Sequence, residues 1–442
     1  MKHIKRLFLL QYILLFCILV SCNGAGKSTV STKVVEKTDS CKLDAKNTYE
    51  VYIPSRENDV DKLPLLVIID SHGSGKFALD KFKRGANQYP AVLIASNLIK
   101  NGYEGYEGAI QALIEDVRQK YPVNETVFMT GFSGGARMVL GYGLAHSLNG
   151  LIMCGALANA DQLNALRCPV ISISGMDDFN FMETAQYLFN EKLTPSNLKI
   201  ELTNSSHSWP DSLILANALG FLRFSYKDVD NPALPESKFI LYCQQKQARI
   251  NSLKKQGEFL KATLVAGNMA LTKPFNSNAV FATTYQALKA TPGYISQLNR
   301  LKKCLDYEIS VRQAYVDAFQ TKDTVWWKNE ISNTDKKINE DKDPYTIDMF
   351  RRIKGFWGIA CYSLCKQAIN QHNVEVLTKI LSIYRVLEPE NPDMFYFSSF
   401  PAFWTGNTES ALSTLKKAIN GGFSDRSQLT NDFPESFTSK LK

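Results

Sequence analysis

The sequence predicts a two-part protein, an α/β region built on a mostly parallel sheet followed by an all-α helical region. From about residue 48 to 224, short apolar runs alternate with amphipathic stretches, a pattern typical of parallel strands covered by helices on both faces. After about residue 237 the strand-like runs end and long helical periods take over. The length of 442 residues also favours two domains, because it exceeds what one hydrophobic core usually supports.

Seven short apolar runs are the expected strands. They are 49–53, 65–69, 91–95, 127–130, 151–154, 170–174 and 198–202. The intervening segments have helical periodicity, with apolar residues recurring on one face. The expected helices of this region are 106–120, 136–147, 179–192 and 212–224.

The amino terminus has the pattern of an export signal. Basic residues precede an apolar run from 7 to 20 that is too short to span a membrane, so residues 1–21 are expected to be a signal peptide. The run closes on Leu-Val-Ser-Cys at 19–22, which resembles the bacterial lipobox. The resemblance implies a lipid on Cys22 and, with Asn23 after it, location at the outer membrane of the cell envelope. We expect residues 22–44 to be the lipidated terminus and a flexible linker.

Several functional classes are not expected. The formal net charge of +8 is spread without a Lys/Arg stripe, so nucleic-acid binding is disfavoured. Residues 23–29 resemble a phosphate loop, but Ser21 stands where the first glycine is required and no strand precedes it. Cys361 and Cys365 have helical i, i+4 spacing without further ligands nearby, which favours packing over a metal site. We therefore expect no cofactor and no metal.

The strongest chemical signal is a glycine-flanked serine between an apolar strand and a helical pattern. Gly131 and Gly135 stand two residues on either side of Ser133. A tight strand-to-helix turn strains the serine backbone, and glycines avoid collisions with the strand and the helix. The turn also puts Ser133 at the positive end of the following helix, where developing negative charge is favoured. Ser133 is the candidate nucleophile.

The candidate general base is His207. A serine hydroxyl is a weak nucleophile near neutral pH, and histidine is the side chain best suited to accept its proton there. His207 lies in a polar loop directly after the strand expected at 198–202. His146 lies inside a helical pattern and His372 belongs to the helical region, so neither is favoured.

The third group of such a site holds the imidazole in one tautomer. Asp177 and Asp178 both follow the strand expected at 170–174. The motifs Gly-x-Ser-x-Gly, Gly-x-x-Asp and His-x-Trp-Pro resemble the α/β-hydrolases related to polyhydroxybutyrate depolymerases and to feruloyl or acetylxylan esterases. In that pattern the acid comes three residues after the glycine, which selects Asp178 over Asp177. The order Ser133, Asp178, His207 also matches the fold.

The resemblance implies an oxyanion site as well. The turn that starts at His72 follows the strand expected at 65–69 and resembles the family's His-Gly loop. The backbone amides of Ser74 and Gly134 are the candidate donors, because amides fixed there can meet a tetrahedral oxygen without reorganising. His72 is expected to serve the turn rather than the chemistry. Asp70 departs from the family, which usually has an apolar residue before the turn.

The helical region begins after a boundary expected at 227–236, so the α/β domain is expected to be 45–226 and the helical domain 237–442. At about 387–420 the spacing of Ala411, Leu415 and Ala418 resembles one tetratricopeptide repeat, which needs neighbouring helices to bury its face. Four tryptophans have helical spacing, which favours core packing over a binding groove. They are Trp326, Trp327, Trp357 and Trp404.

These observations predict a membrane-anchored serine hydrolase, a carboxylic-ester hydrolase that works through an acyl-enzyme. The resemblance implies acyl or feruloyl esters of polysaccharides as substrates. Two alternatives remain open. One is a peptidase related to prolyl oligopeptidases, which share the fold and the triad. The other is a non-catalytic binding lipoprotein whose helical repeats hold a protein partner. Substrate identity lies in pocket loops rather than in the fold or the triad.

The anchor prediction is tested by Cys22→Ser. Loss of the lipidated thiol should release the protein from the membrane fraction and abolish labelling by a fatty-acid analogue, because acyl chains supply the membrane affinity. Cys17→Ser, a change within the signal segment, is the matched control and should leave both readouts unchanged. A Cys22→Ser protein that still labels and partitions with membranes would contradict the prediction.

Overall fold

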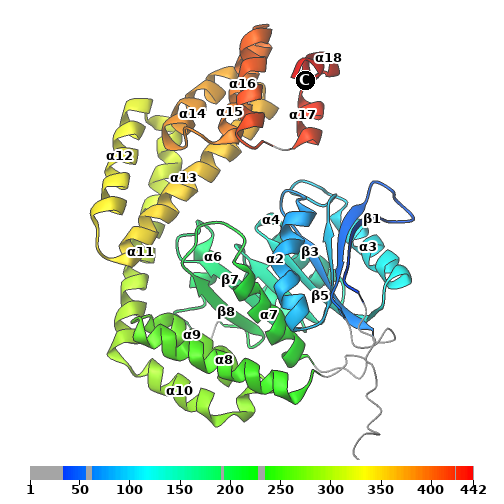
Figure 1. Ribbon diagram of the computed structural model, residues 1–442. Helices are drawn as coiled ribbons and strands as arrows, with labels where there is room; N and C mark the ends of the chain where they lie inside the picture. The colour runs from blue at the N-terminus through cyan, green and yellow to red at the C-terminus, as the bar shows by residue number, and fades with distance from the viewer. Residues whose placement is uncertain (1–32, 56–61, 191–193, 227–233, 424, 442) are drawn as a thin grey trace, which may run out of the picture.

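The computed structural model describes residues 33–55, 62–190, 194–226, 234–423 and 425–441 (Figure 1). The predicted signal peptide and Cys22 lie outside these residues, as does most of the expected domain boundary. Within the described ranges, no helix combines the length and the apolar character that crossing a membrane requires.

The α/β region is built on one eight-stranded sheet with the order β1-β2-β4-β3-β5-β6-β7-β8. β1 and β2 pair antiparallel, β2 pairs antiparallel with β4, and the pairs from β4 to β8 are parallel. The predicted mostly parallel sheet is therefore confirmed. The strands are β1 (Val35–Ser40), β2 (Thr48–Ile53), β3 (Leu63–Ile69), β4 (Val92–Ser96), β5 (Val123–Phe132), β6 (Gly150–Cys154), β7 (Val170–Gly175) and β8 (Leu198–Thr203).

Helices cover both faces of the sheet, so its central strands are buried on each side. Every residue of β3 is buried, because Leu66 and Ile68 join one hydrophobic core while Leu65 and Val67 join the other. The first core lies under α2 and α7, and the second lies under α3 and α4. The helices of this region are α2 (Gly75–Gln88), α3 (Tyr106–Lys120), α4 (Gly134–Ala145), α5 (Ala160–Ala165), α6 (Phe181–Ala185) and α7 (Ser212–Ser225).

Two elements correct the sequence-based expectations. β1 lies within the segment 22–44 that was expected to be a linker, and pairs with β2 through Val35 opposite Ile53. Its residues are mostly exposed at the sheet edge, so it has no apolar run to reveal it. The helix expected at 179–192 is only the short α6, since a turn that carries polar residues occupies its first positions.

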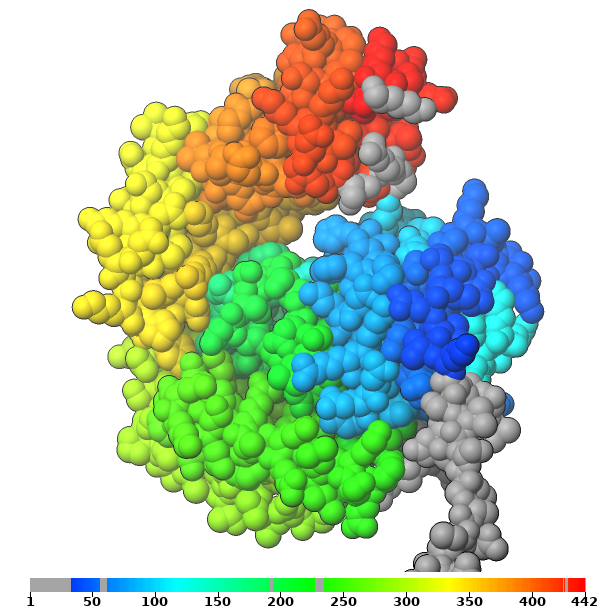
Figure 2. Space-filling view, viewed as in Figure 1, coloured from blue at the N-terminus to red at the C-terminus, as the bar shows by residue number. Residues whose placement is uncertain are grey.

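The second part of the chain is entirely helical. The chain passes below the sheet in α8–α10, rises along α11 and α13 beside β7, and ends in α14–α18 above the sheet (Figure 1). Its helices are α8 (Glu236–Lys255), α9 (Phe259–Ala270), η1 (Phe275–Ser277), α10 (Ala279–Lys289), α11 (Pro292–Thr321), α12 (Thr324–Glu340), α13 (Pro344–Asn370), α14 (Val374–Leu387), α15 (Pro392–Trp404), α16 (Thr408–Asn420), α17 (Arg426–Asp432), α18 (Glu435–Thr438) and η2 (Ser439–Leu441). A hollow separates its upper helices from the α/β body in the space-filling view (Figure 2).

The helical region packs as expected from its small and aromatic residues. α15 and α16 are neighbours, and Ala411, Leu415 and Ala418 are fully buried, while the assignment of a tetratricopeptide repeat stays a prediction. Trp327 and Trp357 are completely buried and pack against each other, so these two rings belong to the core and line no groove. The seven cysteines of the described ranges are all buried and unpaired.

The first helices of the second part share a core with the sheet. Tyr242 of α8 is fully buried, with its ring 5.8 Å from that of Tyr89 and 5.6 Å from that of Phe275. Its hydroxyl donates a 2.9 Å hydrogen bond to the carbonyl of Asn217 in α7. The domain limits at 226 and 237 remain a prediction, and across them the two parts are joined by one apolar contact surface.

Tyr242→Ala tests this joint core. Removing a fully buried aromatic ring should lower the free energy of unfolding by about 3–5 kcal/mol. Tyr242→Phe, the matched control, should cost only about 1 kcal/mol for the lost hydrogen bond. Thermal unfolding should remain a single transition shifted downward in Tyr242→Ala. Two separated transitions, with the α/β part melting as in wild type, would contradict a shared core.

Candidate active site

The serine predicted to be the nucleophile lies on a strained turn between β5 and α4. Ser133 has φ 54° and ψ −117°, a left-handed backbone that a non-glycine residue rarely adopts. A Cβ on Gly135 would lie 2.2 Å from the carbonyl oxygen of Ile69, and one on Gly131 would lie 2.3 Å from the carbonyl carbon of Gly135. Glycine at both positions is therefore what lets strand and helix approach closely enough to form the turn.

The structure brings the three predicted catalytic side chains together. His207 Nε2 lies 2.9 Å from Ser133 Oγ, and His207 Nδ1 lies 2.9 Å from both carboxylate oxygens of Asp178. They follow β5, β7 and β8, whose parallel pairing puts the carboxyl ends of these strands at one edge of the sheet. The contacts form a continuous chain from a buried carboxylate, through an imidazole, to a hydroxyl.

The surroundings of this chain are apolar and largely closed to water. The side chain of Asp178 is 2% exposed and that of His207 is 19% exposed. The ring of Phe132 lies 4.7 Å from the imidazole and that of Phe179 lies 4.2 Å from it. Asp178 Oδ1 also accepts a 2.8 Å hydrogen bond from the amide of Asn180, which fixes the carboxylate in its loop. A low dielectric around these groups strengthens their electrostatic interactions.

Asp177, the competing candidate for the acid, points elsewhere. One of its carboxylate oxygens lies 3.8 Å from Arg351 of α13, and the structure records no contact to His207. Burial raises the pKa of the Asp177 carboxyl despite the attraction of Arg351. The geometry therefore favours Asp178 over Asp177 as the partner of His207, as the spacing of the sequence motif also does.

The two candidate oxyanion donors are not equivalent. Gly134 is the first residue of α4, so its N–H has no acceptor within the helix. The amide of Ser74 instead donates a 3.2 Å hydrogen bond to Asp70 Oδ1. An oxyanion would have to replace or share this long hydrogen bond to use Ser74. The role of Ser74 therefore stays a proposal, and Gly134 is the better placed donor.

Asp70 explains why the turn departs from the family pattern. Its side chain is almost fully buried, and Oδ1 accepts hydrogen bonds from the amides of His72 and Ser74. Oδ2 accepts a 2.7 Å hydrogen bond from the indole N–H of Trp209, two residues after His207. Asp70 thus ties the oxyanion turn to the histidine loop. Sequence reasoning treated Asp70 as an anomaly and missed its partner, although Trp209 was part of the motif.

Asn101 is a second residue that sequence reasoning missed. The backbone N–H of Asn101 donates a 2.9 Å hydrogen bond to the carbonyl of Ser71. This bond holds the loop of Asn101 beside the turn that contains Ser74. A Cβ on Gly134 would lie 1.7 Å from Asn101 Oδ1, so the carboxamide packs directly on the residue after the nucleophile. No motif marks this asparagine, because its position depends on the path of the loop after β4.

The other three histidines of the described ranges make no recorded contact with Ser133. His72 has a 76% exposed side chain and contacts Ser71, its neighbour in the turn. His146 lies 2.9 Å from Glu107 and stacks on Tyr142, and His372 packs on Trp404. These contacts are compatible with the structural roles expected for His72 and His146, and His372 lies in the helical region as expected.

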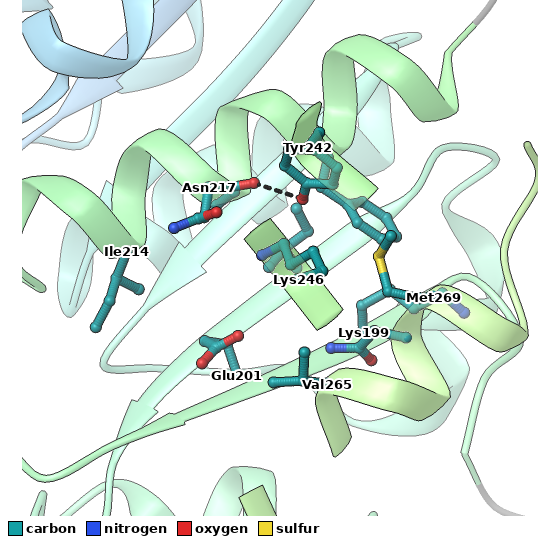
Figure 3. A pocket seen from close by; sticks show the side chains of 12 residues that line it. Lys199, Glu201, Ile214, Asn217, Tyr242, Lys246, Val265 and Met269 are labelled. Carbon is teal, nitrogen blue, oxygen red and sulfur yellow. Dashed lines mark hydrogen bonds between the residues drawn. The ribbon is translucent and has the colours of Figure 1, made fainter. Parts of the chain in front are cut away.

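A cavity lies beside β7 and β8, between these strands and helices α7, α8 and α9 (Figure 3). Its volume is about 30 Å³, room for roughly two water molecules. Burial lowers the pKa of Lys199 and of Lys246, two of its lining residues, to about 8. The cavity is too small for an organic substrate. Among the described residues, no group of three His, Cys, Asp or Glu side chains is placed to hold a metal ion.

Comparison with known proteins finds similarity only to solved structures. No protein family matches the sequence, and no curated protein is similar to it. An S-formylglutathione hydrolase from Staphylococcus aureus shares 13% identity over 43% of this chain and 98% of its own, with a TM-score of 0.34. Esterase B from Lactobacillus rhamnosis shares 14% sequence identity with this chain. The match covers 55% of this chain and 98% of the esterase, with a TM-score of 0.34. An acylaminoacyl peptidase from Pyrococcus horikoshii shares 11% sequence identity with this chain. The match covers 48% of this chain and 45% of the peptidase, with a TM-score of 0.33.

Gly135→Ala tests the packing of the nucleophile turn. The added methyl meets the backbone of Ile69, so the free energy of unfolding should fall by about 1–3 kcal/mol and the turn should shift. Labelling of Ser133 by a fluorophosphonate should slow markedly in the folded protein. Gly108→Ala on α3 is the matched control, since a Cβ there meets open space, and it should stabilise by about 0.5–1 kcal/mol. Normal labelling of Gly135→Ala would contradict the packing argument.

Proposed function

We propose that this chain is a serine hydrolase that cleaves carboxylic esters through an acyl-enzyme. The observation that carries the proposal is the unbroken chain of contacts from Asp178 through His207 to Ser133, with each distance 2.9 Å. The strained backbone of Ser133 at the start of α4 supports it further, because such strain persists where the surrounding structure imposes it. The presence of all three groups in contact favours catalysis over the alternative of a non-catalytic binding protein.

In the first half of the reaction, Ser133 Oγ attacks the ester carbonyl carbon while His207 Nε2 takes the hydroxyl proton. The Asp178 carboxylate accepts a hydrogen bond from the N–H at Nδ1, so the lone pair of Nε2 faces the serine. When the tetrahedral intermediate collapses, the bond from carbon to the leaving oxygen breaks. His207 then gives the proton to the departing alcohol, and the acyl group stays on Ser133.

In the second half, water attacks the acyl-enzyme and His207 takes one of its protons. Collapse of this second intermediate breaks the bond from the acyl carbon to Oγ and returns the proton to Ser133. The negative oxygen of each intermediate would be stabilised by the Gly134 N–H at the positive end of α4, with Ser74 as the proposed second donor. At the end of the cycle Ser133 has its hydroxyl proton again and His207 is again neutral at Nε2, so no net change remains on the protein.

The substrate class is a finer proposal, supported by the motif resemblance to feruloyl and acetylxylan esterases. Acyl or feruloyl esters of polysaccharides are the proposed substrates. A peptidase related to prolyl oligopeptidases would use the same groups on an amide, so hydrolysis rates on acetyl, feruloyl and peptide substrates separate the two. Faster turnover of the peptides than of both esters would reverse the proposal on substrate class.

We also propose that the enzyme is held at the outer membrane by a lipid on Cys22. The support is the signal pattern of residues 1–21 and the lipobox-like sequence before Cys22. These residues lie outside the described ranges. A protein partner on the helical region, the other proposed role of its repeats, is compatible with catalysis, since α14–α16 lie apart from the sheet (Figure 1).

The proposed roles are tested together by kcat/KM on one ester. Ser133→Ala and His207→Ala should each reduce kcat/KM by roughly 10⁴- to 10⁶-fold, because the nucleophile or its base is removed. The double variant should be hardly worse than either single variant, since the two groups act as one unit. Fluorophosphonate should label wild type and fail to label Ser133→Ala. Labelling that persists in Ser133→Ala would move the nucleophile to another residue.

A matched pair of aspartate variants serves as the control. Asp178→Asn should keep the fold and lower kcat/KM by about 10⁴-fold, because the imidazole loses the partner that fixes its tautomer. Asp177→Asn, the same change one residue away, should have a far smaller effect because Asp177 contacts Arg351 instead of His207. All variants must unfold at similar temperatures for the comparison to hold. Collapse in Asp177→Asn with normal turnover in Asp178→Asn would exchange their roles.

A further inference from the structure

Two arginines of the helical region donate hydrogen bonds to the loop that carries Asp178. Arg352 of α13 donates a 2.5 Å hydrogen bond from Nη1 to the carbonyl of Met176. Arg312 of α11 donates a 3.0 Å hydrogen bond from Nη2 to the carbonyl of Phe179. The two acceptors lie on either side of Asp178, so the acid loop is held on both flanks by groups more than 130 residues further along the chain.

A single carboxylate orients both arginines. Glu308 Oε2 accepts a 2.8 Å hydrogen bond from Arg352 Nε, and Oε1 accepts a 2.7 Å hydrogen bond from Arg312 Nη2. The side chains of Glu308 and Arg352 are both 0% exposed. We call Glu308, Arg312 and Arg352 the arginine clamp. Glu308 and Arg352 are thus buried between the helical region and the sheet, while the side chain of Arg312 is 24% exposed.

Helix α13 also lies beside the ring that packs on the proposed base. A Cβ on Gly355 of α13 would be in ordinary van der Waals contact with Phe179, at 3.4 Å, so this part of the helix faces the Phe179 side chain. The Phe179 ring in turn lies 4.2 Å from the His207 imidazole. The loop is thus fixed at its two carbonyls and at its aromatic side chain, all from one direction.

We infer that the arginine clamp positions the catalytic acid, so that the active site is completed by the helical region. Arg352 is a positioning residue that acts on His207 through Met176 and Asp178, and it touches neither the substrate nor the reacting atoms. The inference rests on the proposed function, since it assigns a role to Asp178 within that mechanism. It gives the helical region a part in catalysis beyond any partner that it holds.

A purely stabilising role does not account for this cluster. Burying an ion pair carries a large desolvation cost, and replacing it with well-packed apolar residues of similar volume is often neutral or stabilising. What apolar residues lack is the ability to donate hydrogen bonds to the carbonyls of Met176 and Phe179. A planar guanidinium can bind a carboxylate and a carbonyl at the same time in a fixed geometry. The cluster therefore defines where the loop lies.

The test uses the full chain with Glu308→Leu/Arg312→Met/Arg352→Met, which removes all three charges of the arginine clamp together. The folded protein should hydrolyse p-nitrophenyl acetate with kcat lowered by about 10²-fold and KM little changed, the effect of a displacement of about 1 Å in a catalytic group. The acid limb of the kcat/KM profile should also move to lower pH, because a displaced carboxylate favours the protonated imidazole less. A smaller folded fraction would scale activity equally at every pH.

A double-variant cycle separates positioning from general damage. When Asp178→Asn is already present, adding the clamp substitutions should lower kcat only slightly further, because the carboxylate that the clamp positions is already lost. Arg300→Met, at an exposed ion pair with Asp343 between the same two helices, is the matched control and should leave kcat and the pH profile unchanged. An equal loss in both backgrounds, or an unaltered kcat and pH profile, would overturn the inference.

Hydrogen exchange gives a readout that does not need activity. The Asp178 amide donates to the carbonyl of Gly175, and the Phe181 amide donates to the carbonyl of Asp178. Exchange at these amides should become faster in the clamp variant while amides of α3 keep their rates, and unchanged exchange would overturn the inference. If wild type neither hydrolyses the ester nor labels at Ser133, the proposed function fails while the exchange result still decides whether the clamp orders the loop.

Discussion

The parallel pairing of β5, β6, β7 and β8 is the constraint on which the site depends. Ser133, Asp178 and His207 are separated by tens of residues, and each follows the last residues of a strand in this set. Because all four strands run in the same direction, their carboxyl ends meet at one edge. Reversing a single six-residue strand would move its catalytic side chain by about 20 Å, the length of the strand. The hydrogen bonds between these strands therefore bring the three side chains to the same edge of the sheet.

Much of this could be predicted from the sequence, because its signals are local. Buried parallel strands are continuous apolar runs, and the seven that the sequence predicts are all present. The turn that carries Ser133 requires small residues at fixed offsets, and Ser133 was selected because Gly131 and Gly135 stand between an apolar strand pattern and a helical pattern. The choice of Asp178 over Asp177 came from the spacing of a family motif, and the geometry at His207 agrees with it.

What could not be predicted depends on contacts between distant segments. β1 is an exposed edge strand whose sequence has no apolar alternation, so only its pairing with β2 defines it. Asp70 looked out of place because its partner, Trp209, lies 139 residues away. Glu308 and Arg352 lie in long helices where charged residues are ordinarily solvated, and no local pattern shows that both are buried. Such pairs become visible only when the helical region is placed against the sheet.

The position of the first strand has a consequence for orientation. Val35 of β1 pairs with Ile53, and β2 runs against β4, so both residues lie at the amino ends of the parallel strands. Ser133 lies at the opposite end of the same sheet. A lipid on Cys22, if present as proposed, would therefore join the described part of the chain at the end of the sheet opposite Ser133. The proposed attachment point and the proposed reactive face would then lie at opposite ends of the α/β body, so that attachment need not obstruct the approach of a substrate to Ser133.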